Sequence, residues 1–372
     1  MEKLGLYLHI PFCRSKCAYC DFLSFPNLDR MESYKNKLLL EIAYYADKLK
    51  GEYIVDTVFI GGGTPSILPL GYVSEIVDAI CKNFTVASEV EITVESNPES
   101  LDVDKVSEYQ NACNRVSLGV QSLNNKTLKI IGRAHDENQA RRALELLTNT
   151  NLKVNADLIL GLPESEDDCL RSVSGVLDCG VKHLSAYGLG VEKGTKLFDM
   201  VKDGVCTLPD GDRVADLYNE VLSLTSRYGL ERYEVSNFAH PGYECKHNLG
   251  YWTRKSYLGM GLGAHSLLQN ARFYNTSSLS DYLNTINFDE IKTLDAKLSK
   301  EDELEESVML GLRLSDGITL SVIKERFGVD ILDKYSKGIS KLSKVLDVTE
   351  EKIRVKKEYF YTLNSIIVEF LD

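Results

Sequence analysis

Short apolar runs recur through the first half of the chain, with helix-like stretches between them. The runs cover residues 4–10, 57–60, 90–96, 115–121, 154–160 and 183–189. Apolar residues spaced by three and four, as in amphipathic helices, fill the stretches near residues 30–50, 70–83, 102–112, 137–149 and 166–178. This alternation predicts an α/β fold with a parallel sheet, and six βα units are enough for a partly closed barrel.

Four of these runs are polar on one face. Alternate residues of a strand lie on opposite faces, so Val90, Ile92 and Val94 oppose Glu91, Thr93 and Glu95. The other three runs present a polar face made of Arg115, Ser117, Gly119, Gln121, Asn155, Asp157, Ser185 and Tyr187. Parallel strands are ordinarily apolar on both faces. We therefore expect a barrel interior that holds a polar ligand, and the alternative is a sheet edge open to water.

The pattern changes after about residue 190. A region rich in Gly and aromatic residues continues to about Asn275, and from about Leu294 the chain becomes charged and helical. We predict a barrel over residues 1–236, an extension over 237–290 and a small C-terminal α or α+β domain over 291–372.

Composition excludes several classes of protein. A hydrophobic content of 44% with 26% charged residues is not that of a disordered chain. The formal net charge of −12 would repel a phosphate backbone, so we expect no nucleic-acid partner. No apolar run approaches the roughly 18 to 20 residues of a membrane span, and the first ten residues lack a signal pattern. We expect a cytoplasmic protein that is not itself a membrane protein.

Three of the nine cysteines lie together, as Cys13, Cys17 and Cys20 directly after the first run. Loops at this position carry the sites of βα barrels. Neighbouring thiolates in a reduced compartment indicate a metal or cluster. Zinc would need a fourth ligand, for which His9 and Asp21 are the nearest candidates, whereas a [4Fe–4S] cluster held by three cysteines leaves one iron open. We favour the cluster. The other cysteines are single and form no disulfide framework: Cys81, Cys113, Cys169, Cys179, Cys206 and Cys245.

The segment YLHIPFCRSKCAYCD, from Tyr7 to Asp21, resembles the radical S-adenosylmethionine (SAM) superfamily, and GGGTPS at 61–66 fits the same pattern. The resemblance implies a partial (βα)6 barrel and a [4Fe–4S] cluster on the three cysteines. It also implies that the open iron binds the amino and carboxylate groups of SAM. One electron delivered through the cluster would then cleave SAM to methionine and a 5′-deoxyadenosyl radical.

Further segments resemble the coproporphyrinogen III dehydrogenase-like branch, among them ESNP at 95–98, SLGVQ at 117–121 and DLILGLP at 157–163. Carried over position by position, this likeness implies SAM contacts at Tyr7, Tyr19, Gly62, Gly63, Thr64, Glu95, Gln121, Arg133 and Asp157. Glu95, Gln121 and Asp157 also lie on the polar strand faces, so the alternation of polar residues and the resemblance indicate the same three residues.

Two departures argue against porphyrinogen oxidation. Phe22 stands where that enzyme has a further cysteine, and the chain begins six residues before Tyr7, where the enzyme has a longer extension. Instead, CKHNLGYW at 245–252 resembles the H-N-x-x-Y-W signature of the HemW-type haem chaperones.

This signature offers groups that suit haem. His247 carries an imidazole for haem iron, Cys245 a thiolate, and Tyr251 and Trp252 flat faces for a porphyrin. The alternative is a hydrogen-bonded histidine among core aromatics, and His265 is a secondary haem candidate.

The sequence therefore predicts a protein that binds haem and a SAM-coordinated [4Fe–4S] cluster and passes haem to an acceptor protein, either soluble or membrane-bound. An electron donor and a homodimer are further expectations from the likeness. The rival functions are oxygen-independent coproporphyrinogen III dehydrogenase and a cluster protein that only transfers electrons.

Overall fold

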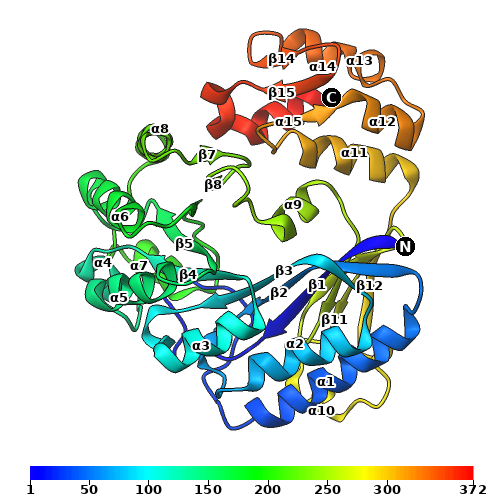
Figure 1. Cartoon of the computed structure of the whole chain (residues 1–372). Helices are drawn as coiled ribbons and strands as arrows, with labels where there is room; N and C mark the ends of the chain where they lie inside the picture. Colours follow the sequence, from blue (N-terminus) through cyan, green and yellow to red (C-terminus); the bar gives the residue numbers. More distant parts are fainter. Residues whose placement is uncertain (372) are drawn as a thin grey trace.

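The computed structural model describes residues 1–371, and its central feature is one large curved sheet (Figure 1). Six parallel strands are neighbours in chain order. They are β1 (Glu2–Ile10), β2 (Tyr53–Gly62), β3 (Val86–Ser96), β4 (Arg115–Gln121), β5 (Lys153–Leu160) and β6 (His183–Gly188). All six match the apolar runs of the sequence, so the predicted partial (βα)6 barrel is confirmed.

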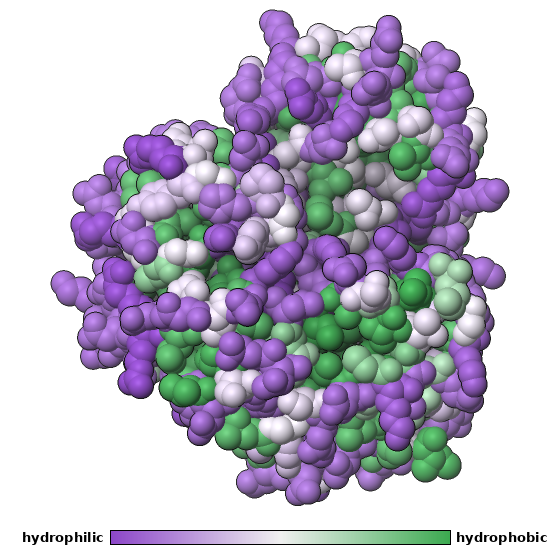
Figure 2. Space-filling model, viewed as in Figure 1, coloured by the Kyte–Doolittle hydropathy of each residue, from purple (hydrophilic) through white to green (hydrophobic). Residues whose placement is uncertain are grey.

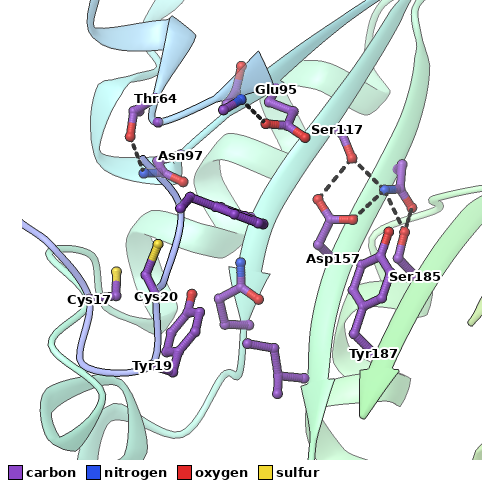
Figure 3. Close-up of a pocket in the computed structure, with 18 of the residues that line it drawn as sticks. Cys17, Tyr19, Cys20, Thr64, Glu95, Asn97, Ser117, Asp157, Ser185 and Tyr187 are labelled. Atoms are coloured by element: carbon purple, nitrogen blue, oxygen red, sulfur yellow. Dashed lines mark hydrogen bonds between the residues drawn. The ribbon is translucent and has the colours of Figure 1, made fainter. Parts of the chain in front are cut away.

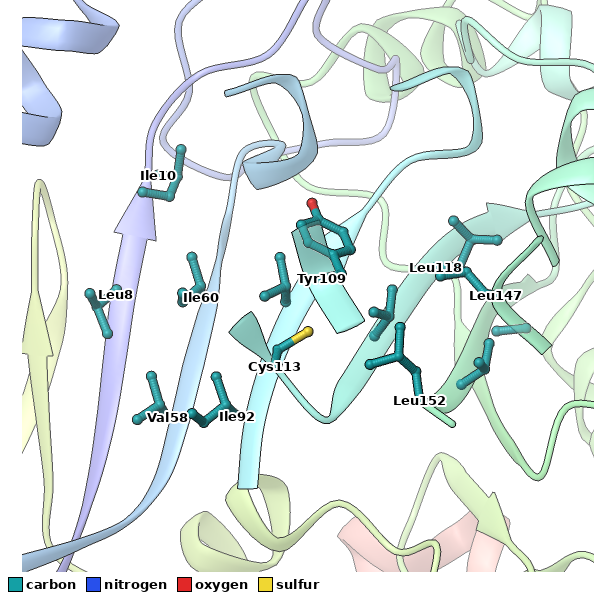
Figure 4. Close-up of a cluster of buried hydrophobic side chains, with 14 of the residues drawn as sticks. Leu8, Ile10, Val58, Ile60, Ile92, Tyr109, Cys113, Leu118, Leu147 and Leu152 are labelled. Atoms are coloured by element: carbon teal, nitrogen blue, oxygen red, sulfur yellow. The ribbon is translucent and has the colours of Figure 1, made fainter. Parts of the chain in front are cut away.

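Helices cover the outer face of this sheet. The five predicted ones are α1 (Met31–Lys48), α2 (Tyr72–Asn83), α3 (Val103–Ala112), α5 (Glu137–Thr148) and α6 (Glu166–Asp178). Asp102, Asp136 and Ser165 cap α3, α5 and α6 by accepting a hydrogen bond from the backbone at the third helical residue. Against these helices pack the apolar strand faces, among them Leu8, Ile60, Ile92 and Leu118 (Figure 4). The polar strand faces are thereby turned to the other side of the sheet.

Several elements were not predicted from the sequence. They are the short helices α4 (Asn125–Ile130) and α7 (Lys196–Lys202), the 17-residue α8 (Gly211–Arg227), and the 3-10 turns at Pro65–Ile67, Pro98–Ser100 and Lys357–Thr362. Asp210 caps helix α8 by accepting a hydrogen bond from Arg213 N, and the helix buries Leu217, Val221 and Leu224. It supplies the sixth helix of the barrel, in the region after residue 190 where the alternation of apolar runs and helix-like stretches is no longer seen in the sequence.

The sheet continues beyond the barrel on both sides. Next to β1 come β9 (Tyr257–Met260), β10 (His265–Leu268), β11 (Ala271–Asn275) and β12 (Lys292–Lys297), and next to β6 come β8 (Asn237–Ala239) and β7 (Glu231–Arg232). Helix α10 (Leu279–Asn284) lies in the β11–β12 connection, and α9 (Lys246–Trp252) contacts β2. Strand β12 extends the large sheet past residue 291, and the predicted domain boundaries stay a prediction.

The C-terminal part of the chain has a core of its own, which includes Leu304, Val308, Ile353 and Phe370. It comprises α11 (Lys300–Gly311), β13 (Ile318–Thr319), α12 (Leu320–Phe327), α13 (Ile331–Lys334), α14 (Ser336–Lys341), β14 (Leu346–Val348), β15 (Lys352–Val355) and α15 (Leu363–Leu371). Its three strands form a separate antiparallel sheet, so the small unit is α+β.

Polar side chains cover most of the outer rim of the molecule in Figure 2, and hydrophobic residues come to the surface mainly near the centre of that view. Within residues 1–371, no helix combines the length and the apolar character that crossing a membrane would require.

A buried carboxyl group ties the extension to the barrel. Glu41 of α1 is fully buried and accepts hydrogen bonds from Tyr282 Oη (2.6 Å), Gly261 N (2.8 Å) and Asn275 Nδ2 (2.8 Å). Beside it, the Tyr34 hydroxyl donates to the carbonyl of His9 at 2.7 Å. Because His9 lies near the end of β1, this network holds the strand that precedes the cysteine loop.

We predict that Glu41→Ala lowers the free energy of unfolding by about 3 kcal/mol, because three buried donors lose their acceptor. Tyr282→Phe, which removes one donor from the same carboxyl group, should cost only about 1 kcal/mol. Urea unfolding of the two variants measures both values. Equal effects of the two substitutions would contradict the prediction that the three hydrogen bonds to Glu41 stabilise the fold together.

Candidate functional site

A cavity of about 590 Å³ lies on the polar inner face of the barrel. It reaches from the cysteine loop to α9, and its lining includes fourteen residues that the sequence predicted: Tyr7, Cys13, Cys17, Tyr19, Cys20, Gly62, Gly63, Thr64, Glu95, Gln121, Arg133, Asp157, His247 and Tyr251. Trp252 is half-buried on α9 and is not among the lining residues. His265 is exposed on β10, away from the cavity.

Strand register explains why the polar faces form one wall (Figure 3). Glu95 of β3 pairs with Ser117 of β4, which pairs with Asn155 of β5, which pairs with His183 of β6. Paired residues of adjacent parallel strands lie on the same face of a sheet, so polar positions in register become neighbours. The predicted polar interior is therefore confirmed, and its ligand stays a prediction.

The cysteine loop follows β1 and is anchored by backbone hydrogen bonds. Ala18 N donates to the carbonyl of Ile131 at 2.8 Å, and Cys13 N donates to that of Phe25 at 3.1 Å. All nine cysteines of the chain are free thiols. Burial raises the pKa of the Cys20 thiol, and the neighbouring Cys17 and Cys13 raise it further.

Donors from the barrel reach two of the loop sulfurs. Thr64 Oγ1 lies 3.4 Å from Cys13 Sγ, and Arg133 Nη1 lies 3.6 Å from Cys17 Sγ. Arg133 Nη2 also donates to Asn97 Oδ1 (2.8 Å) and to the carbonyl of Gly119 (2.6 Å), while its Nε is buried without a hydrogen-bond partner. These contacts hold the guanidinium group of Arg133 between the Cys17 sulfur and β4.

The glycine triplet closes the end of β2 against β1. Gly63 N donates to the carbonyl of Ile10 at 2.8 Å, and Gly62 has a φ of 109°, which favours glycine. A Cβ on Gly62 would lie 2.4 Å from the His9 ring. That ring is itself held by Tyr7 Oη at 2.9 Å and by the carbonyl of Leu23 at 2.8 Å. His9 thereby joins β1 to Leu23, which follows the third cysteine of the loop.

Two carboxyl groups face the cavity from neighbouring parts of the wall. Burial raises the pKa of Glu95 to about 7, an effect to which the nearby Asp157 adds, although Gly62 N donates to its Oε2 at 3.0 Å. Burial also raises the pKa of Asp157, which accepts hydrogen bonds from Ser117 Oγ (2.8 Å) and Asn155 Nδ2 (2.7 Å). Both groups suit a cationic ligand, because a cation would favour their ionised form.

The opposite end of the cavity is closed by α9. His247 is 3% exposed, and both of its ring nitrogens have partners: Thr57 Oγ1 lies 2.9 Å from Nδ1 and Tyr251 Oη lies 2.9 Å from Nε2. Burial and the nearby Lys255 lower its pKa to about 3, so the imidazole is neutral at physiological pH. Burial, with Glu91, raises the pKa of Cys245 to about 12, which keeps it a thiol rather than the thiolate considered from the sequence.

Some lining residues carried no assigned role in the sequence. Asn97 and Asn155 bridge other polar groups, and Tyr187 is 40% exposed at the mouth of the cavity. The alternation of polar residues along β5 and β6 was the signal available for Asn155 and Tyr187. Their partners depend on strand register, which the alternation does not specify.

Comparisons with known proteins agree with this geometry. The family model of the radical SAM superfamily matches residues 7–174, and that of the HemN C-terminal domain matches residues 298–356. The heme chaperone HemW of Lactococcus lactis is 32% identical over 372 residues, covering 98% of this chain and 96% of that protein. The chain belongs to the HemW family.

Two further relatives support the family and the fold. The heme chaperone HemW of Escherichia coli is 38% identical over 274 residues, covering 71% of this chain and 70% of that protein. The solved structure of coproporphyrinogen III oxidase (HemN) from Escherichia coli, a radical SAM enzyme, superposes with a TM-score of 0.85 at 22% identity. That match covers 99% of this chain and 90% of the HemN chain, and it shows a shared fold.

Membership of the radical SAM superfamily implies SAM and a [4Fe–4S] cluster, and the residues present fit both. Three free thiols line one cavity, the buried Arg133 Nε lacks a partner, and two carboxyl groups face the same space. Within residues 1–371, no three His, Cys, Asp or Glu side chains converge closely enough to hold a single metal ion. The thiols of a [4Fe–4S] site bind three different irons and need not converge as the ligands of zinc do.

We predict that the wild-type protein loses stability relative to Glu95→Gln as the pH rises from about 4.5 towards 7. The carboxyl pKa is higher in the folded than in the unfolded state, so its contribution is fully present at low pH and is lost as the pH rises through the folded value. Melting temperatures of both proteins across this range measure the difference. Glu89→Gln, an exposed carboxylate on the same strand, is the control, and a Glu95→Gln difference that stays flat with pH would contradict the raised pKa.

Proposed function

We propose that this chain is a haem chaperone that binds haem together with a SAM-coordinated [4Fe–4S] cluster and passes the haem to an acceptor protein. The observation that carries the proposal is that a single cavity is lined both by the three loop cysteines and by His247 and Tyr251 of α9. Support comes from the similarity to proteins named heme chaperone HemW, one of which matches over 98% of this chain.

In this proposal, the three cysteines ligate three irons of the cluster. The SAM contacts are Tyr7, Tyr19, Gly62, Gly63, Thr64, Glu95, Gln121, Arg133 and Asp157, all of which line the cavity. When bound, the cluster and SAM supply one-electron chemistry. The chain positions SAM with two carboxyl groups and a guanidinium, and it encloses the ligand between the cysteine loop and the strand ends.

Haem is proposed to bind on the α9 side of the cavity, with His247 as iron ligand and Tyr251 and Trp252 as flat contact surfaces. A neutral imidazole is the form that ligates a metal, and burial keeps His247 neutral. Its Nε2 is engaged by the Tyr251 hydroxyl and its Nδ1 by Thr57. Iron coordination through Nε2 therefore requires the Tyr251 hydroxyl to move away.

The remaining partners belong to the same proposal. They are a haem acceptor, soluble or membrane-bound, an electron donor for the cluster, and a second copy of the chain in a homodimer. A cytoplasmic setting is included because three unpaired cysteines close together need a reducing compartment.

Oxidation of coproporphyrinogen is not proposed. Phe22 lines the cavity and is 63% exposed. It stands at the position where the resemblance implies a further cysteine in the porphyrinogen-oxidising enzyme. At 22% identity, the structural likeness to HemN shows a shared fold and carries no statement about activity.

We expect cluster-loaded protein to bind about one haem per chain, and His247→Ala to weaken binding about tenfold or more through loss of the iron ligand. Tyr251→Phe keeps the aromatic face but frees Nε2, so it should bind haem as tightly as wild type or more tightly. An anaerobic titration followed by Soret absorbance measures all three proteins. Saturable binding that is unchanged in His247→Ala would exclude this histidine as ligand, and absence of saturable binding would refute the chaperone proposal.

Reductive cleavage of SAM is a separate expectation. Reconstituted protein with SAM and dithionite should yield 5′-deoxyadenosine, and Cys17→Ser should yield none above background, because one iron loses its ligand. Chromatography of the reaction mixture measures the product. Cys81→Ser, which alters an exposed cysteine of α2, is the matched control, and equal yields from Cys17→Ser and wild type would show that the loop cluster is not involved.

A further inference from the structure

The largest fully buried side chain in the described structure is Arg115, the first residue of β4, which is 1% exposed and lines the cavity. Its Nη1 donates to the carbonyl of Tyr243 at 2.8 Å, and its Nη2 is buried with no hydrogen-bond partner. A guanidinium carries five N–H donors and stays charged at every physiological pH. A buried charged donor without an acceptor is costly, which points to an acceptor that the chain itself does not supply.

The nearest carboxylate balances part of this charge but leaves Nη2 without an acceptor. Glu91 Oε2 forms a buried ion pair with Arg115 Nη1 at 3.9 Å, which is longer than a hydrogen bond. Glu91 Oε1 instead accepts from His247 N at 3.1 Å and lies 3.5 Å from Cys245 Sγ, so this carboxylate holds the start of α9. Asp157, the other acidic group nearby, is occupied by Ser117 and Asn155.

A second unpartnered donor stands next to Arg115. Thr93 of β3 is its register partner, is fully buried and lines the same cavity, and its Oγ1 has no hydrogen-bond partner. Because the two residues are paired on adjacent parallel strands, their side chains lie on the same face. A guanidinium N–H beside a hydroxyl is a donor pair that suits the two oxygens of a carboxylate.

Aromatic rings lie on the strands beyond Thr93. Phe59, two residues after Thr57 on β2, pairs in register with Thr93 and lies 5.1 Å from the His247 ring, centroid to centroid, at an interplanar angle of 30°. Tyr7 lies 6.4 Å from Phe59, also at 30°. A flat apolar wall beside buried donors matches a planar ring system that carries carboxylates.

Two ligands of the proposed function carry a carboxylate, namely SAM and haem. The donors around the cysteine loop, Thr64 and Arg133, stand at the carboxyl ends of the strands, whereas Arg115 is the first residue of its strand and is connected through Glu91 to the α9 segment that holds His247. The donor pair therefore lies on the proposed haem side of the cavity.

We propose that Arg115 and Thr93 form a carboxylate subsite that receives a propionate group of haem. This inference rests on the proposed haem-binding function and adds to it a position for one edge of the porphyrin. His247 and Arg115 would then hold haem by two separate contacts, one to the iron and one to the periphery.

The test compares haemin with haemin dimethyl ester, in which both propionates are esterified, in the same detergent buffer. Wild-type protein should bind haemin about tenfold more tightly than the ester, because a charge-assisted hydrogen bond is lost. In Arg115→Gln and in the near-isosteric Thr93→Val this preference should shrink towards unity. Arg171→Gln, whose side chain on α6 is 71% exposed, should keep the full preference.

A second measurement separates the two carboxylate sources. The affinity of haem-free, cluster-loaded protein for SAM should be the same in Arg115→Gln as in wild type. A loss of SAM affinity in Arg115→Gln, with the haemin preference intact, would assign the subsite to SAM and overturn the proposal.

The remaining outcomes are distinct. Wild-type protein that binds haemin and its ester equally would overturn the subsite while leaving haem binding in place, and this comparison needs no variant to fold. Wild-type protein that binds neither would refute the proposed function and the subsite together. Circular dichroism and melting temperature confirm that each variant is folded, and Arg115→Lys, which keeps the charge, should retain part of the preference.

Discussion

Polar side chains enclosed by a parallel sheet must find partners, and this requirement organises the site. Register between β3, β4, β5 and β6 places Glu95, Ser117, Asn155 and His183 side by side on the inner face. Some of these groups satisfy one another, as Asn155 does with Ser117 and Asp157. Others are satisfied by α9, which supplies donors to Glu91. The groups left over, on Arg115, Thr93 and Arg133, line the cavity without a hydrogen-bond partner from the chain.

The same hydrogen bonds connect the two ends of the cavity. Asp157 bonds to Asn155, whose Oδ1 lies 2.6 Å from His183 Nδ1. His183 Nε2 lies 2.8 Å from Tyr233 Oη, which in turn accepts from the backbone of Cys245 at 3.2 Å. A continuous chain of hydrogen bonds therefore runs from Asp157 on the cavity wall to the backbone of Cys245, the residue that precedes α9.

The barrel and much of its wall could be predicted because they depend on local pattern. Alternation of apolar and polar residues identified β3 to β6 and set Glu95, Gln121 and Asp157 on the inner face, and the spacing of Cys13, Cys17 and Cys20 identified the loop. Helix α8 was missed although its apolar residues have helical spacing. Strands β9 to β12 were missed because their apolar stretches are short, and they are held by tertiary contacts that include those of Glu41 with Gly261 and Asn275.

The sequence by itself determined the fold class, the order of the strands and the residue types available for chemistry, since periodicity and motif spacing are properties of neighbours in the chain. Only the tertiary structure decided which of those residues meet. It enclosed His247 between Thr57 and Tyr251 and left Trp252 outside the cavity lining, although both are on one seven-residue helix. It also left Arg115 Nη2 without a hydrogen-bond partner, although Nη1 of the same guanidinium forms an ion pair with Glu91. The physical reason is that hydrogen-bond satisfaction and burial are set by contacts between segments far apart in the chain, such as Glu91 and His247, which are 156 residues apart. No local pattern encodes such contacts.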